Sequence, residues 1–355
     1  MLKRTGGSKR STRVRGAARA TSIVVGVIVA AGLLAGCGAS SGPNGAITLY
    51  NGQHEQTTDA LVKAFEKESG IQVNTRNDDE DVFAAQIRAE GSNSPADVFY
   101  TENTPALESL GEKGLLARVL PSTLAATPAR LNSATGNWVG TSARVSVMIY
   151  NTNMLKPSQL PTSIMALADP AWKGKLALAP QETDFQPIVT SVAAAHGKAA
   201  ALAWLEGLKG NAGSHTYPDN ETLVDQVNRG QAAIGVINQY YWYRARAEVG
   251  ASNTHTAIAY FAAGDPGYVI DVSGAGILKS SSHQASAQKF LAFLVSRAGQ
   301  EIIAHSDSFE YPIGSGVTTA QAETPFAALR PNPITIEQLG DGSSALGLLQ
   351  QAQLL

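Results

Sequence analysis

The chain has 355 residues, of which 44% are hydrophobic and 16% charged, a composition that is typical of a globular protein and excludes wholesale disorder. The length predicts two lobes or domains. The first 36 residues hold seven basic side chains and no acid, so the remainder carries 20 bases against 29 acids, a net charge of −9. Such an acidic chain argues against a nucleic-acid partner, and its single cysteine excludes an internal disulfide framework and a cysteine-based zinc cluster.

The N-terminus predicts an exported lipoprotein. The basic head precedes an apolar run over residues 23–34, which suits a signal peptide and is too short for a confident membrane span. The run ends in Leu34-Ala35-Gly36-Cys37, which resembles the bacterial lipobox. The resemblance implies that residues 1–36 are removed, that Cys37 is lipidated, and that residues 37–45 form a flexible tether. The alternative is a transmembrane anchor with an idle cysteine. We expect the folded part in the periplasm or lipid-anchored to the outer face of the cytoplasmic membrane.

From residue 46 onward, short strands alternate with helices. Apolar alternation or short apolar runs between turn residues predict strands over 46–50, 71–75, 96–100, 145–150, 176–179, 232–237, 257–261 and 268–272. Helical spacing predicts helices in the segment ending at Ser69, over 81–90 with Val82, Ala85 and Ile87 inward, around Leu107, Leu110 and Leu115, and over 185–196, 198–208, 220–230, 244–249, 283–295, 297–305 and 344–354. This alternation predicts an α/β protein with parallel-rich sheets, in which ligands bind at the carboxyl ends of strands.

Three of these strand ends carry side chains that could bind a ligand. His54 follows the first strand, Glu102 follows the third, and Tyr240 and Tyr241 follow the strand over 232–237. Each has a plainer interpretation: His54 as a helix-capping residue, Glu102 as a solvated acid, and the tyrosines as packing aromatics. Neighbouring tyrosines can converge on one site only if the strand has already ended, because adjacent strand residues face opposite ways.

Taken together, the four side chains favour a hard, highly charged cation. Hard metal ions prefer oxygen donors, and imidazole also suits iron. A phenol with an ordinary pKa near ~10 needs a strongly polarising metal to ionise at neutral pH. Two phenolates and one carboxylate offset the three charges of Fe³⁺ with His54 neutral. Four donors leave one or two positions of an octahedral ion open.

The three segments resemble the ligand segments of bacterial ferric-ion-binding proteins, the substrate-binding components of iron(III) ABC transporters. The similarity runs in order over residues 46–330, and it is carried by Tyr50–His54, Pro95–Glu102 and Asn238–Tyr243, with weaker likenesses at Trp172–Lys175, Ser273–Lys279, Ala287–Phe290 and Glu310–Pro312. The resemblance implies a transferrin-like, two-lobe periplasmic-binding-protein (type II) fold with a hinge and an interlobe cleft. It implies Fe³⁺ held by His54, Glu102, Tyr240 and Tyr241, a monomer, and an ABC permease and ATPase as partners.

The same resemblance implies the lobe boundaries. Residues 46–145 plus 270–320 would form lobe 1, and residues 146–269 plus 321–355 would form lobe 2. His54 and Glu102 would then face the two tyrosines across the cleft, and bound iron would favour closure.

One segment departs from the family. Many members complete the iron shell with a bound anion, often phosphate, but here Glu182 and Asp184 lie in the corresponding segment and would repel phosphate. We expect that no free phosphate is needed and that Glu182, Asp184 or a water completes the shell. The alternative is that both acids face solvent. The polar positions of such a pocket are partly kept by Asn103, Asn220 and Asn238, and Arg144 is expected near the hinge, where it would balance an excess carboxylate.

Two other functions stay open at this point. The same fold could bind an organic cation such as thiamine or a polyamine, with Tyr240, Tyr241 and Trp242 forming an aromatic cage. A protein of a different class, an exported hydrolase, could use Glu102 or Asp184 as acid and base. We expect a ferric-ion receptor and not an enzyme.

Overall fold

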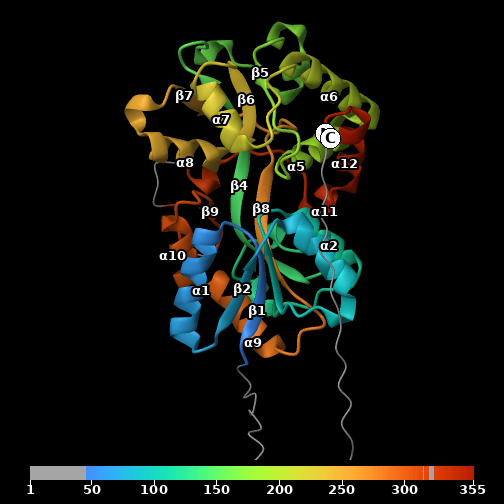
Figure 1. The fold of residues 1–355 in the computed structure, drawn as a ribbon, viewed down its shortest axis with the longest axis vertical. Coiled ribbons are helices and arrows are strands. Elements are labelled where there is room, and N and C mark those ends of the chain that lie inside the picture. Colours follow the sequence, from blue (N-terminus) through green and yellow to red (C-terminus); the bar gives the residue numbers. More distant parts are fainter. Residues whose placement is uncertain (1–44, 315, 320–323) are drawn as a thin grey trace, which may run out of the picture. The chain divides into compact units, whose positions relative to one another are not determined.

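The computed structural model describes residues 45–314, 316–319 and 324–355 (Figure 1). The predicted signal peptide, the lipidation site at Cys37 and almost all of the predicted tether lie outside these residues. Within them, no helix has both the length and the apolar character that a bilayer crossing requires.

The described strands form one mixed sheet. Its order is β2-β1-β3-β8-β4-β6-β5, and β7 and β9 each pair with β4. The strands are β1 Ile47–Gly52, β2 Val73–Asn77, β3 Val98–Thr101, β4 Trp138–Asn151, β5 Leu176–Ala177, β6 Ile234–Asn238, β7 Thr256–Ala259, β8 Ile270–Ile277 and β9 Tyr311–Pro312. The strand β1 is parallel to β2 and β3, and β5 is parallel to β6. All pairings of β4 and β8 are antiparallel, so the sheet is not parallel-rich as predicted.

Two long strands connect the two lobes (Figure 1). Residues 138–145 of β4 pair with β8, whereas residues 146–151 pair with β6 and β7. The sequence predicts only the second part of β4, because Gly140, Thr141, Ser142 and Arg144 interrupt its apolar pattern. All fourteen residues of β4 are nevertheless buried, since the sheet pairs them on both sides.

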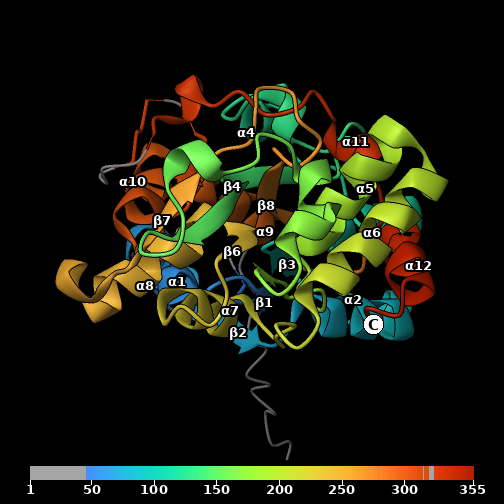
Figure 2. The same ribbon diagram turned by 90° about the horizontal axis from the view of Figure 1, so that it is seen from above.

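Helices cover the sheet in both lobes. They are α1 Glu55–Ser69, α2 Glu80–Glu90, α3 Thr104–Glu112, α4 Pro121–Leu124, α5 Phe185–His196, α6 Lys198–Ala212, α7 Asn220–Asn228, α8 Gln239–Val249, α9 Gln284–Leu294, α10 Arg297–His305, α11 Ile336–Leu339 and α12 Ser343–Gln351. In the first lobe, built around β1–β3, α1 packs against α9 and α10 over an apolar cluster of its own. In the second lobe, built around β5–β7, α12 packs on α5 and α6, and α7 on α8 (Figure 2).

The inward face of α2 differs from the predicted one. Phe83, Ala84 and Ile87 are buried, whereas Val82 is 46% exposed and Ala85 is also exposed. The helix begins at Glu80, and positions 83, 84 and 87 share one face at helical spacing. Val82 therefore faces solvent beside the cleft described below.

The close pairing of β4 with β8 predicts a sharp requirement for glycine at position 140. A Cβ on Gly140 would lie 2.2 Å from the carbonyl oxygen of Leu131 and 3.0 Å from Val272 Cγ1. We expect Gly140→Ala to lower the free energy of unfolding by about 1–3 kcal/mol, as overpacking does. The control is Gly210→Ala in α6, where nothing lies within 4 Å of the added Cβ, and which should stabilise by roughly 0.5–1 kcal/mol. Equal melting temperatures of the two variants would contradict this account.

Candidate metal centre

His54 and Glu102 meet because two neighbouring parallel strands end at the same edge of the sheet. Gly52 at the end of β1 pairs with Thr101 at the end of β3. His54 then occupies the N-cap position of α1 without a side-chain capping bond, and Glu102 directly follows β3. His54 Nδ1 lies 2.7 Å from Glu102 Oε1. The two side chains therefore form an ion pair at the edge of the cleft, and His54 is not a capping side chain.

The two tyrosines approach this pair from the other lobe. The strand β6 ends at Asn238 and α8 begins at Gln239, so Tyr240 and Tyr241 lie in the first turn of a helix. Their rings stack with centroids 4.1 Å apart, and the Tyr240 ring meets the His54 ring edge-on at 5.2 Å. The strand does end before the tyrosines, which is the condition for both rings to face one site.

Burial and neighbouring charges shift the pKa values of His54, Glu102, Tyr240 and Tyr241. Burial alone would lower the pKa of His54, but the charge and hydrogen bond of Glu102 outweigh it and raise that pKa. Burial opposes ionisation of Glu102, yet its pKa is lowered because His54 lies against it. Burial and the charge of Asp184 raise the pKa of both Tyr240 and Tyr241 far above the ordinary value. The phenols therefore keep their protons unless a strongly polarising ion replaces them.

Asp184 lies inside this cluster, whereas Glu182 lies at its edge. Asp184 is 4% exposed; it accepts a hydrogen bond from the Tyr240 hydroxyl at 3.4 Å and one from the Tyr241 hydroxyl. Glu182 is half-buried and accepts the backbone N–H of Asn220 at 2.9 Å. Burial and the nearby Asp184 charge raise the pKa of Glu182 to about 8. The expectation that both acids could face solvent does not apply to Asp184.

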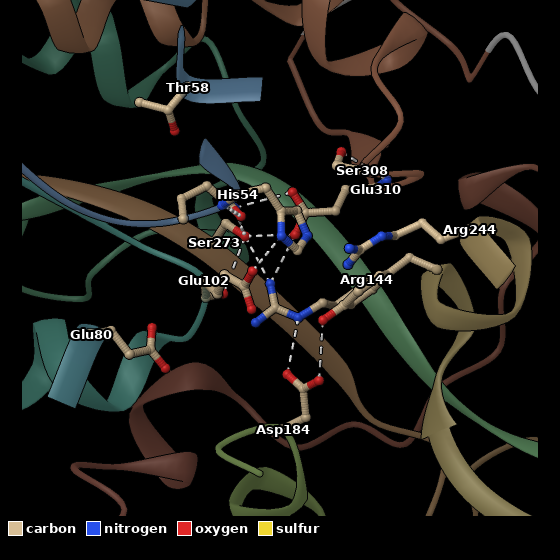
Figure 3. A network of polar contacts seen from close by, with 12 residues as sticks. His54, Thr58, Glu80, Glu102, Arg144, Asp184, Arg244, Ser273, Ser308 and Glu310 are labelled. Atoms are coloured by element: carbon tan, nitrogen blue, oxygen red, sulfur yellow. Dashed lines mark hydrogen bonds and ion pairs between the residues drawn. The ribbon is translucent and has the colours of Figure 1, made fainter. Parts of the chain in front are cut away.

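Arg144 lies at the centre of the polar network (Figure 3). Its side chain has no exposed surface, and its Nε lies 3.4 Å from Asp184 Oδ1. Its Nη1 lies 3.0 Å from Glu310 Oε1 and donates to Ser273 Oγ at 2.8 Å, while its Nη2 donates to Asn103 Oδ1. Burial acts to lower the pKa of Arg144, but Asp184 and Glu310 keep it well above its usual value. Arg144 thus lies beside two acids, next to the point where β4 changes its partner strand.

The three asparagines take different roles. Asn103 connects the lobes, because its side-chain amide donates to Thr183 Oγ1 at 2.9 Å while its oxygen accepts from Arg144. Asn220 offers its backbone N–H to Glu182. Asn238 lies behind the tyrosines and donates to Asp271 Oδ2 at 3.3 Å.

An open cavity of about 660 Å³ leads to His54 and Glu102 from solvent. Both lobes line it, and its acidic side chains are Glu55, Asp78, Asp79, Glu80, Asp81, Glu102 and Glu182. So many acids beside one opening attract cations and repel anions. Val82, the exposed residue of α2 described above, lies at the edge of this cavity.

His54 Nε2 is buried without a hydrogen-bond partner, whereas Asp184 Oδ1 and Arg144 Nε, 3.4 Å apart, form an ion pair without hydrogen-bond geometry. Leaving a buried polar atom unpaired is costly, and a bound cation would satisfy His54 Nε2. Within the described part of the chain, no group of three or more His, Cys, Asp or Glu side chains is placed to hold a metal ion. A metal ion in the cleft would therefore need the phenol oxygens of Tyr240 and Tyr241 as ligands.

Several residues of this network were not predicted. Gln53, Glu80, Ser273 and Glu310 all contact it. Ser273 and Glu310 lie in segments whose family likeness was recognised, but nothing local to them indicates a site. Their partners are up to 257 residues away in the chain.

The sequence and the fold have close counterparts in known proteins. The family of bacterial extracellular solute-binding proteins matches residues 51–301. The "Fe(3+)-binding periplasmic protein" of Serratia marcescens is 37% identical over 320 residues, which are 90% of this chain and 94% of that protein. The crystal structure of iron-bound HitA from Pseudomonas aeruginosa is 40% identical with a TM-score of 0.82, over 86% of this chain and 99% of HitA. FutA (IdiA) of Trichodesmium, in complex with iron and citrate, is 30% identical with a TM-score of 0.77, over 86% of this chain and 99% of FutA.

The buried acid Glu80 predicts a pH-dependent stability. It accepts the backbone N–H and the side-chain amide of Asn103, and burial with the Glu102 charge raises its pKa to about 8. A raised pKa means that the proton on Glu80 stabilises the fold fully below about pH 4.5, the unfolded pKa, and that this contribution is lost as the pH rises towards 8. The stability of Glu80→Gln should therefore fall less between these pH values than that of the unsubstituted protein, by about 1 kcal/mol or more.

Thermal melts of the metal-free proteins at several pH values measure this difference. The control is Glu68→Gln, which removes an exposed acid on α1. A difference between Glu80→Gln and the unsubstituted protein that stays constant from pH 4.5 to 8 would show that Glu80 ionises normally.

Proposed function

The chain belongs to the family of bacterial extracellular solute-binding proteins, and we propose that it binds Fe³⁺ in the cleft between its lobes and delivers it to an ABC permease. Its relatives of known function bind ferric iron. The protein acts in transport and is not an enzyme. The observation that carries the proposal is the pair of stacked tyrosines, of which Tyr240 lies against His54 where that histidine lines the acidic cavity.

The donor set suits a ferric ion and few others. His54, Glu102, Tyr240 and Tyr241 supply one imidazole, one carboxylate and two phenolate oxygens, and hard ions prefer oxygen. The pKa of each phenol is raised in the metal-free protein, so only an ion of high charge displaces both protons. Four protein donors leave room in an octahedral shell for a further ligand.

Asp184 is the residue we assign to that further position. Its carboxylate lies against both tyrosines, because Oδ2 accepts from the Tyr240 hydroxyl and the Tyr241 hydroxyl also donates to it, while Oδ1 faces Arg144 Nε at 3.4 Å. Its carboxylate would therefore stand where many relatives of this type hold a free anion, with a water as the alternative. Glu182 lies farther out, and its pKa of about 8 leaves it mostly protonated at neutral pH, so it is not the residue that we expect to exclude phosphate.

Iron would bind by closing the two lobes on one another. Lobe 1 comprises residues 46–145 and 270–320, and lobe 2 comprises residues 146–269 and 321–355, with β4 and β8 as the hinge. The change of β4 partners between Val145 and Ser146 supports this division. His54 and Glu102 come from lobe 1 and both tyrosines from lobe 2. Only the closed form brings all four together, so the ion stabilises that form.

The protein acts outside the cytoplasmic membrane, together with the permease and ATPase of its transporter. Its relatives include a periplasmic protein. We assign the finer location from the lipobox-like segment before Cys37, which would hold the mature protein at the outer face of the membrane as a monomer.

The cleft does not favour an organic cation as ligand. An aromatic cage would need Trp242 beside the two tyrosines. The Trp242 indole N–H instead donates to Thr256, and its ring already carries the Arg246 guanidinium at 5.1 Å. The aromatic surface left for a ligand is therefore too small for such a cage.

Tyrosine ligation predicts a coloured holoprotein. Titration of the apoprotein with ferric citrate should produce a visible tyrosinate-to-iron absorption band. Tyr241→Phe should lose much of this band and about 10- to 100-fold or more in iron affinity, because one phenolate ligand is removed. Tyr243→Phe on the same helix is the matched control. A colourless wild-type protein, or a Tyr241→Phe variant indistinguishable from the control, would refute the proposed site.

The assignment of Asp184 predicts independence from phosphate. Added phosphate should leave the spectrum of the iron-loaded wild-type protein unchanged. Asp184→Asn should weaken iron binding by about tenfold or more, and phosphate should then alter its spectrum, because an anion can occupy the vacated place beside Arg144. Glu182→Gln is the control and should behave like wild type. A wild-type spectrum that shifts with phosphate, with Asp184→Asn unaltered, would exclude Asp184 as a ligand.

A further inference from the structure

We propose that Glu310, with the carbonyl group of Phe309 before it, is a positioning element that sets the relative placement of the metal-binding residues of both lobes. This inference rests on the proposed function. Neither residue is among the expected metal ligands. Both lie on the segment that returns from α10 to the hinge, ahead of β9.

The carboxylate of Glu310 is buried and fully engaged. Its side chain is 1% exposed. Oε1 faces Arg144 Nη1 at 3.0 Å and Ser273 Oγ at 2.9 Å. Oε2 accepts from Ser142 Oγ at 2.9 Å and from Gln53 Nε2 at 3.1 Å. Four donors on two oxygens leave this group one orientation.

Glu310 thereby determines the orientation of Gln53. The Gln53 amide nitrogen donates to Glu310 and to Ser273, so its oxygen must face the other way. That oxygen accepts the backbone N–H of His54 at 2.7 Å. Ser273 also donates to the backbone carbonyl of Glu102 at 3.1 Å or to Glu310. Gln53 thus ties the segment that carries His54 to this carboxylate directly. When Ser273 gives its single proton to Glu102, the segment that carries Glu102 is tied to the carboxylate through Gln53 and Arg144, which donate to both Ser273 and Glu310.

The preceding residue makes the matching contact to the second lobe. The carbonyl oxygen of Phe309 accepts from Gln239 Nε2 at 3.1 Å, and Gln239 directly precedes Tyr240. The oxygen of the same Gln239 amide accepts the backbone N–H of Val145 at 2.8 Å. Two glutamines, each one residue ahead of an expected ligand, are therefore bonded to two consecutive residues of one segment.

The backbone of this segment is strained in the way that such a role requires. Phe309 has φ of 56°, in the left-handed region that a bulky residue rarely adopts. Strain of this kind persists only where surrounding contacts hold it, and it gathers at functional positions. Here it turns the Phe309 carbonyl towards Gln239 while the Glu310 side chain faces Gln53. The segment is a rigid link and not a passive connection.

Glu310→Gln tests the link because it keeps the shape and replaces one acceptor oxygen with an NH₂ donor. The new NH₂ group can face either Gln53 Nε2 or the Arg144 guanidinium. We expect it to face Gln53, because facing Arg144 would leave the buried positive charge without an oxygen acceptor there. Gln53 must then turn its oxygen towards residue 310, which leaves two N–H donors against one another at His54. We expect ferric affinity, measured by competition with citrate, to fall by about 10- to 100-fold, and the electron paramagnetic resonance signal of the bound iron to change.

The reciprocal exchange should restore much of this loss. In Gln53→Glu with Glu310→Gln, the carboxylate at position 53 accepts both from residue 310 and from the His54 N–H. Gln53→Glu alone places two carboxylates about as close as the present 3.1 Å hydrogen bond, so it should bind iron weakly. If the double variant regains at least half of the loss in the logarithm of ferric affinity, residues 53 and 310 are directly coupled.

Asp97→Asn is the matched control for a purely structural role. Asp97 is also a buried first-lobe carboxylate, 4% exposed. It accepts hydrogen bonds from Thr48 and Ser281 at a place away from the cleft. It should lower the melting temperature of the apoprotein without changing ferric affinity. Should Glu310→Gln not fold, Gln53→Met removes the same link while Glu310 and Arg144 stay paired, and it should weaken iron binding in the same direction.

These experiments distinguish failure of the proposed function from failure of the positioning role of Glu310. A wild-type protein without the tyrosinate band would refute the proposed function itself. A wild-type protein with the band, beside a Glu310→Gln or Gln53→Met variant that keeps full affinity and an unchanged resonance signal, would overturn only the positioning role. A loss of affinity in Asp97→Asn equal to that in Glu310→Gln would overturn it as well.

Discussion

The buried guanidinium of Arg144 is the constraint on which the rest of the cleft depends. A charge without access to water is tolerated only when it is paired and hydrogen-bonded, and this side chain has no exposed surface. It therefore draws Glu310 from the first lobe and Asp184 from the second to one place. Because β4 carries Arg144 to the point where its partner strand changes, the pairing occurs where the lobes meet. Asp184, which we propose as a further ligand, and Glu310, which we propose as a positioning residue, are thus held at one place in the metal-free protein.

That crowding of acids also explains why an ion of high charge suits the cleft. Asp184 adds negative charge beside two phenols whose pKa is already raised by burial. The phenol protons are therefore held firmly, and an ion that displaces them must stabilise the resulting phenolates with its own positive charge. Ions of lower charge gain less from the same donors. The acid-rich cavity outside Glu102 adds a field that favours cations over free anions, which accords with a protein carboxylate in place of phosphate.

Residues with a local pattern could be predicted, and residues without one could not. His54, Glu102, Tyr240 and Tyr241 follow strand ends, where parallel neighbours bring their ends to one edge. Gln53 also follows a strand end, but nothing there indicates its contact with Glu310, and Glu310 has no such signal, because each acquires its role from a partner on a distant segment. The prediction that Val82 and Ala85 face inward on α2 was wrong for a related reason. Its apolar residues allow more than one face, and only packing against the sheet selects Phe83 over Val82.

Strand–helix alternation predicted the α/β class, the N-terminal segment before Cys37 predicted export, and the resemblance of three short segments to ferric-ion-binding proteins implied the two lobes and the chemistry of the cargo. These features depend on residue type and on spacings of a few positions, which the linear chain displays directly. The mixed sheet, the full length of β4 and β8, and the burial of Arg144 were decided by tertiary structure alone. Long-range pairing buries polar residues such as Ser142 and Arg144 that local periodicity assigns to the surface, and hydrogen-bond partners hundreds of residues apart are chosen only when the sheet has formed.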